Sequence, residues 1–274
     1  MDRIKNTIEL AKVSWQVLMH DRELLWIPVL SMFASLGLLI VLAIPAFAML
    51  DTSSSEESVS PGVAFVGLLA ALGLSVIAVF FKGALVAAAH DRMTGGDPTV
   101  SNAISRATKH IAGLVPWALL TATVGLILQA IRERSGILGR IVTNIAGAAW
   151  EIVTFLVIPA IIIDDMGAID GVKRSGQLLK RTWGENLAAR VGFGLVGFAA
   201  AIPLILVVVL LAASGSTALL VVGIAIAVVG FALISVVLTA LNAIFQTALY
   251  MYATTGETPT AFRGTSLAQS FVHK

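Results

Sequence analysis

The chain has 274 residues, of which 58% are hydrophobic and 12% charged, and its mean hydropathy is +0.94. These values exclude an ordinary soluble domain, in which apolar and charged residues are more evenly balanced. The 18 Lys and Arg residues exceed the 16 Asp and Glu residues by only two and are dispersed, which excludes a nucleic-acid partner.

Six apolar stretches follow one another along the chain, and each has at least about the 20 residues that cross a bilayer as a helix. They are continuously apolar, without the alternation of barrel strands, so we predict an all-α polytopic membrane protein with a single domain over 1–274. The predicted spans are 24–50, 62–89, 113–131, 141–163, 187–213 and 217–253. The last stretch is too long for one upright span and too short for two, which indicates a long tilted helix.

An amphipathic segment precedes each pair of spans. Residues 1–21 carry charges throughout and contain no cleavable signal pattern. In all three segments apolar residues recur every three or four positions, which is typical of a helix lying in the membrane interface. The three stripes are Ile4, Ile8, Ala11, Trp15 and Leu18, then Val100, Ile104, Ala107 and Ile111, then Ile169, Val172, Gly176, Leu179 and Trp183. We therefore predict three hairpins, each preceded by an interfacial helix.

The same pattern predicts an internal repeat, with copies at about 1–90, 100–165 and 168–256. Ser14–Leu18 matches Ser175–Leu179 at Ser, Gln and the final Leu. Phe81–Leu85 matches Phe245–Leu249, and a loop with Gly, Pro and Thr follows each of these two segments. Such a loop ends one helix and caps the next. Chance likeness among apolar helices is the alternative.

The connectors between spans predict the orientation. Those at 51–61, 132–140 and 214–217 hold only three basic residues, Arg132, Arg134 and Arg140, whereas most other Lys and Arg lie on the opposite side. Because Lys and Arg resist translocation, both termini should be cytoplasmic. The acidic stretch 51–58 then forms a solvated outer loop to which we assign no binding role.

Four polar residues inside the spans form a candidate site. Lys82 and Glu151 are expensive to place in hydrocarbon, and the repeat puts Asn242 and Gln246 near their depth. They could form a polar site between the even-numbered spans for an ion, a lipid headgroup or a transported solute. The alternatives are a structural ion pair, or a snorkelling Lys82 beside a protonated Glu151.

A second candidate is the basic segment with Lys173, Arg174, Lys180 and Arg181. Cations near an anionic leaflet attract lipid headgroups, so we expect contact with lipid headgroups or with a partner protein. Positive-inside topology alone would also place these residues there.

Catalytic motifs are missing from the sequence, and we predict no enzyme activity and no cofactor. The chain has no cysteine, which excludes thiolate catalysis and cysteine-ligated zinc. His20-Asp21-Arg22 recurs as His90-Asp91-Arg92, and two His-Asp pairs brought together could bind a divalent metal. Their spacing matches no metalloenzyme motif, so we assign no metal site.

Several longer segments resemble a known family. They are Ser14–Ser31, Gly95–Thr99, Trp117–Gly125 and Lys173–Gly184. Together they resemble an uncharacterised family of prokaryotic integral membrane proteins, a domain of unknown function, over nearly the whole chain. The resemblance implies a six-span fold in the plasma membrane and brings no activity. A looser likeness links Lys-Arg-Ser and Thr-Trp-Gly to the membrane domain of some glycerophosphoryl diester phosphodiesterases, but their catalytic barrel is absent here.

Two main hypotheses of function follow. The first is a non-enzymatic protein that binds membrane lipids or acts as a scaffold for other membrane proteins or further copies of itself. The second is a small transporter or channel. The polar residues gather toward the cytoplasmic half of the spans, which favours binding over transport. A third hypothesis, an intramembrane enzyme, would have to use Lys82 and Glu151.

Overall fold

The structure is a computed structural model that describes residues 12–49, 60–257 and 259, and for 180–196 the helix without its side chains. All elements in these ranges are helical, which confirms the all-α prediction. Ile4, Ile8 and Ala11 of the first amphipathic stripe, and the acidic stretch 51–58, lie outside the described residues. After a helix over 12–20, the elements are η1 (Arg22–Leu25), α2 (Trp26–Ala48), α3 (Pro61–Met93), α4 (Val100–Lys109), α5 (Ile111–Arg134), α6 (Ile137–Val153), α7 (Val157–Ile163), α8 (Ala168–Ala213) and α9 (Thr217–Thr255).

The chain is a multi-pass membrane protein by the length and apolarity of its helices. Within the described residues, five segments are long and apolar enough to cross a bilayer. These are Arg22–Ala48, Pro61–Met93, Ile111–Arg134, Ile137–Ile163 and Thr217–Thr255. A shorter apolar segment, Gly197–Ala213, falls in the predicted fifth span 187–213. The beginning of that predicted span lies where side chains are not described.

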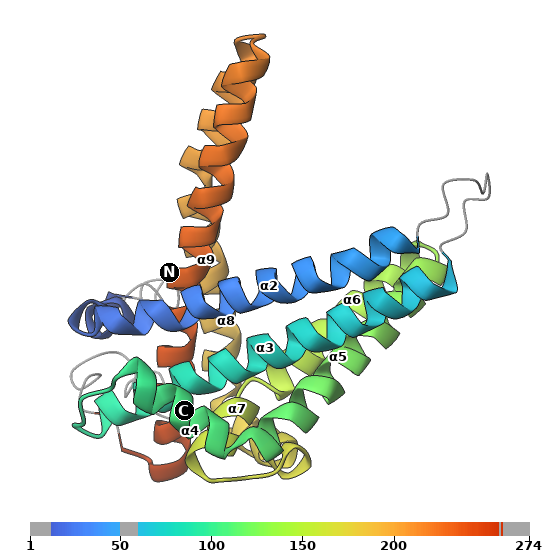
Figure 1. Cartoon of the computed structure of the whole chain (residues 1–274). Helices are drawn as coiled ribbons and strands as arrows, with labels where there is room; N and C mark the ends of the chain where they lie inside the picture. The colour runs from blue at the N-terminus through green and yellow to red at the C-terminus, as the bar shows by residue number, and fades with distance from the viewer. Residues whose placement is uncertain (1–11, 50–59, 258, 260–274) are drawn as a thin grey trace.

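The helices form two groups that meet at a common base. Figure 1 shows α2, α3, α5 and α6 running alongside one another, while the hairpin of α8 and α9 rises away from them. The two helices of this hairpin pack extensively on each other, and α9 also packs against α3. Residues 240–250 of α9 are nearly all buried, whereas most of 217–235 is exposed and apolar. The base of the hairpin therefore belongs to the core, and its outer part presents an apolar surface suited to lipid.

The predicted fourth span, 141–163, is interrupted between α6 and α7. Residues 154–156 leave the helix, and a side chain from α8 replaces the lost backbone hydrogen bonds. The Leu156 amide donates to Ser175 Oγ at 3.1 Å, and Ser175 Oγ donates to the Val153 carbonyl at 2.5 Å. Because an unpaired backbone group is costly away from water, Ser175 makes the break tolerable. The short helix α7 is then buried over 157–162.

The segments expected at the interface take two forms. Residues 169–183 and the predicted fifth span belong to one continuous helix, α8. By contrast, α4 is a separate helix of 10 residues that buries Ala103 and Ala107 and is capped by Thr99, whose hydroxyl accepts from the Asn102 amide at 3.2 Å. Gly256 ends α9 in the left-handed conformation, with φ of 74°, as the loop motif predicts.

Candidate functional site

A cavity of about 630 Å³ lies where the two helix groups meet, between α2, α3 and α9. This volume falls in the range of about 300–1,000 Å³ that small-molecule sites occupy. Its walls are largely apolar, with Met32 from α2, Phe81 and Leu85 from α3, and Val236 and Leu238 from α9. An amphiphile could therefore place its hydrocarbon against these walls.

Polar groups face the same cavity from all three helices. Lys82 lines it from α3 and Ser31 from α2, and Ser235, Thr239 and Asn242 line it from α9. The three residues on α9 are spaced by four and three positions, so they form one stripe along a single helix face. Asn242 Oδ1 is buried and has no hydrogen-bond partner among the described residues. The described lining of the cavity thus combines the cation of Lys82, several hydroxyls and an unsatisfied acceptor.

The four polar residues predicted inside the spans take three different positions. Lys82 and Asn242 line this cavity, as their predicted common depth allows. Gln246, one turn further along α9, is 1% exposed and its Oε1 has no partner among the described residues. Glu151 lies on an exposed position of α6 and does not line the cavity. A joint site of all four residues stays a prediction.

Ion pairs tie the ends of the helices together at the base. Arg92, in the last turn of α3, binds both carboxylate oxygens of Asp21, at the start of η1. The Asp21 side chain is only 8% exposed, whereas Asp97, a further partner of Arg92 at 3.1 Å, is 92% exposed. The buried carboxylate therefore depends on Arg92, and the pair fixes the entry to α2 against the end of α3.

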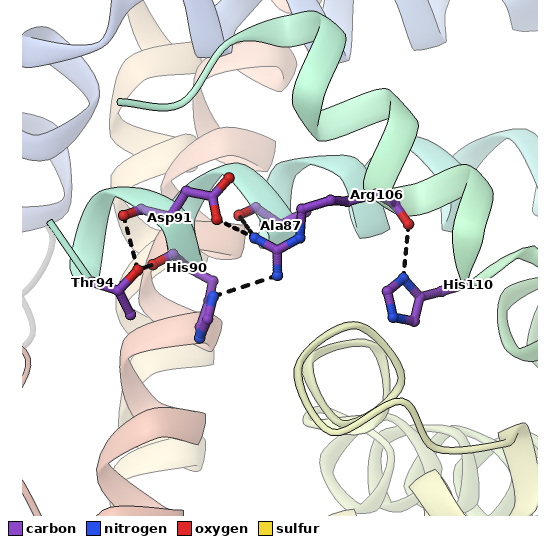
Figure 2. A network of polar contacts seen from close by, with 6 residues as sticks. All are labelled: Ala87, His90, Asp91, Thr94, Arg106 and His110. Atoms are coloured by element: carbon purple, nitrogen blue, oxygen red, sulfur yellow. Dashed lines mark hydrogen bonds and ion pairs between the residues drawn. The ribbon is translucent and has the colours of Figure 1, made fainter. Parts of the chain in front are cut away.

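A second network joins α3 to α4 and the start of α5. Arg106 pairs with Asp91, donates to the Ala87 carbonyl at 3.3 Å, and lies 3.5 Å from His90 Nδ1. Figure 2 shows these groups converging on the guanidinium of Arg106. His110 Nδ1 donates to the Arg106 carbonyl at 2.7 Å. The planar fork of Arg106 thus holds α4 on the end of α3.

The two His-Asp-Arg repeats of the sequence are used for these networks. Asp21 of the first repeat binds Arg92 of the second, and Asp91 of the second binds Arg106. In the described part of the chain, no group of three His, Asp or Glu side chains is placed to hold a metal ion. The arginines occupy the carboxylates that a metal would need.

The basic segment predicted to contact headgroups points in two directions. Lys173 is 68% exposed and pairs with Asp170 at 3.0 Å. Arg174 instead lies beside the hydroxyl of Tyr250, and its Nε is buried without a partner among the described residues. Tyr250 donates to Asp164 Oδ2 at 2.5 Å. Arg174 therefore belongs to the contacts between α7, α8 and α9, and the side chains of Lys180 and Arg181 lie outside the described residues.

The hydroxyls that line the cavity were not among the site residues predicted from the sequence. Ser235 and Thr239 precede Asn242 at helical spacing inside an apolar stretch, and this periodicity is a signal that could have found them. Ser31 carries no comparable signal, because the approach of α2 to α9 depends on tertiary packing.

Comparison with known proteins supports the resemblance noted in the sequence. No curated protein matches the chain at a significant level. The model of a family of unknown function, DUF6159, matches residues 62–260, which include nearly all of α3 and the whole of α4 to α9. The likeness to the membrane domain of phosphodiesterases stays an expectation. Since the match covers more than half of its length, the chain belongs to the DUF6159 family of unknown function.

Proposed function

We propose that this protein is a non-enzymatic membrane protein that holds a membrane lipid in the cavity between α2, α3 and α9. The observation that carries the proposal is the composition of that cavity. Lys82, Asn242 and three hydroxyls share it with an apolar lining that includes Met32, Phe81 and Leu238. A polar head and a hydrocarbon tail can both be accommodated there, which neither a simple ion nor a polar solute would require.

A cavity-filling variant tests this function. Ala78 and Ala232 line the cavity from α3 and α9, and replacing both with Phe places bulk inside it. The amount of lipid that copurifies with the full chain should then fall to the background that detergent carries over without specific binding. Mass spectrometry of the lipid extract measures this amount. Ala225→Phe is the matched control, because Ala225 is exposed on the same helix as Ala232. Equal lipid retention in the double variant and in wild type would contradict the proposal.

The arrangement in the membrane is part of the proposal. Six spans form three hairpins, each preceded by an amphipathic helix, with both termini on the cytoplasmic side of a prokaryotic plasma membrane. The apolar segment Gly197–Ala213 and the uneven distribution of Lys and Arg support this arrangement. The exposed Lys173 would contact lipid headgroups on the cytoplasmic side, and further copies or other membrane proteins would pack on the apolar surfaces.

The absence of native cysteine makes the topology directly testable. A single cysteine at Ser214 should react with an impermeant maleimide applied to intact cells, and one at Ser105 should react only after the membrane is opened. Both positions are exposed. Labelling of Ser105→Cys in intact cells would contradict the proposed orientation.

Transport is the alternative function, and the same cavity would then be a solute site. Transport would require that the protein carries a solute across the membrane of sealed proteoliposomes and that this flux depends on Lys82. Retained lipid without flux supports binding, and flux of a solute that Lys82→Met abolishes supports transport.

A further inference from the structure

We infer that the cavity selects an anionic phospholipid whose headgroup carries hydroxyls, of the phosphatidylglycerol type. This inference rests on the proposed lipid-binding function and names the class of lipid. Two chemical features of the lining carry it: the sign of its charge and the kind of hydrogen-bonding group that it leaves unsatisfied.

The first feature is charge. Among the residues described around the cavity, Lys82 is the one charged side chain, and no carboxylate lines it. A phosphodiester next to the ammonium of Lys82 is favourable, because charge-assisted contacts are stronger than neutral ones. A zwitterionic headgroup would bring its own cation beside the ammonium of Lys82, and none of the described lining residues supplies a carboxylate for it. Net negative lipids are therefore preferred over phosphatidylcholine and phosphatidylethanolamine.

The second feature is Oδ1, the buried oxygen of the Asn242 side-chain amide. It accepts hydrogen bonds only, and it has no donor among the described residues. A phosphodiester also only accepts, so the phosphate that binds Lys82 cannot satisfy Asn242. A headgroup hydroxyl can, and the hydroxyls of Ser235 and Thr239 extend the same stripe for further hydrogen bonds. A glycerol headgroup meets both requirements in one molecule.

The depth of the cavity supports a bound lipid as opposed to a surface contact. Lys82 precedes His90 by eight residues in α3, which is about 12 Å along the helix axis. His90 and Arg92 mark the polar end of that helix. A headgroup at Lys82 therefore lies below the level at which the headgroups of free lipids sit, and only a protein site would hold it there.

Competition between headgroups tests the inference. The purified, delipidated full chain is offered equal amounts of phosphatidylglycerol, phosphatidylmethanol, phosphatidylethanolamine and phosphatidylcholine with identical acyl chains, and bound lipid is counted by native mass spectrometry. Phosphatidylmethanol is an anionic phosphodiester without a headgroup hydroxyl. We expect wild type to retain phosphatidylglycerol about tenfold over phosphatidylcholine and clearly over phosphatidylmethanol. Lys82→Met should remove the preference for anionic lipids, and Lys82→Arg should keep it. Asn242→Leu should reduce phosphatidylglycerol only, to the level of phosphatidylmethanol.

Two matched controls separate these effects from a general loss of charge or polarity. Lys109→Met removes an exposed cation of α4, and Asn144→Leu replaces an exposed amide of α6, so both should behave as wild type. A contrary result is that wild type retains all four lipids equally, while the cavity-filling double variant Ala78→Phe and Ala232→Phe retains none. This result would overturn the inference about the headgroup and leave the proposed lipid-binding function standing. Retention of no lipid by wild type would overturn both.

Discussion

Replacing Arg92 with Met should destabilise the protein more than any other single loss of charge at the base of the helices. Asp21 is 8% exposed, and both of its carboxylate oxygens bind Arg92. Without Arg92 the carboxylate stays buried with no cation, and such a loss costs about 3–5 kcal/mol of unfolding free energy. The measurement is equilibrium unfolding in mixed micelles with increasing dodecyl sulfate, followed by tryptophan fluorescence.

A double variant and a control make this prediction specific. Asp21→Leu combined with Arg92→Met removes the whole pair and should lie within about 1–2 kcal/mol of wild type, because no charge is left buried. Asp97→Asn removes the exposed partner of Arg92, which is 92% exposed, and should cost less than about 1 kcal/mol. If Arg92→Met is no less stable than Asp97→Asn, or if the double variant is less stable than both single variants, the buried Asp21 carboxylate does not depend on Arg92.

Two further substitutions test the core around α7. Ser175→Ala should cost about 1–3 kcal/mol of unfolding free energy, because the backbone amide of Leu156 and the backbone carbonyl of Val153 lose their shared partner. The same unfolding titration measures this cost. A value near zero would show that the break between α6 and α7 does not depend on α8. Gly113→Ala should cost about 1–3 kcal/mol, because its Cβ would lie 2.8 Å from Ile161 Cγ2 and 2.9 Å from the Met166 carbonyl oxygen. Gly125→Ala is the control on the same helix, since nothing lies within 4 Å of a Cβ added there, and it should be neutral or stabilising. Equal effects of the two substitutions on the unfolding free energy would contradict the close packing of Gly113 against α7.

The helices themselves could be predicted because apolar runs of bilayer length have few alternatives. The predicted span 62–89 falls within α3, and 113–131 falls within α5. The interruption after Val153 could not be predicted in the same way. The sequence around the interruption is as apolar as its surroundings. The hydroxyl that makes the interruption possible belongs to Ser175, 22 positions after Val153.

The site could be predicted in part for the same reason. Lys82 stands out in an apolar span by its cost alone, and the repeat drew attention to Asn242, which shares its cavity. Depth along a helix does not determine the direction in which a side chain points, and Gln246 is packed inside instead. The role of Asp21 depends on Arg92, 71 positions away, so a local motif could only suggest a metal site.

The most direct test of lipid binding is an experimental structure of the full chain in nanodiscs that contain phosphatidylglycerol. A lipid bound as proposed would give elongated non-protein density between α2, α3 and α9, with its head beside Lys82 and Asn242 and its tail along Phe81 and Leu238. A cavity closed by the side chains of α2 and α9, with Lys82 turned out of it and no such density, would show that the protein holds no lipid there.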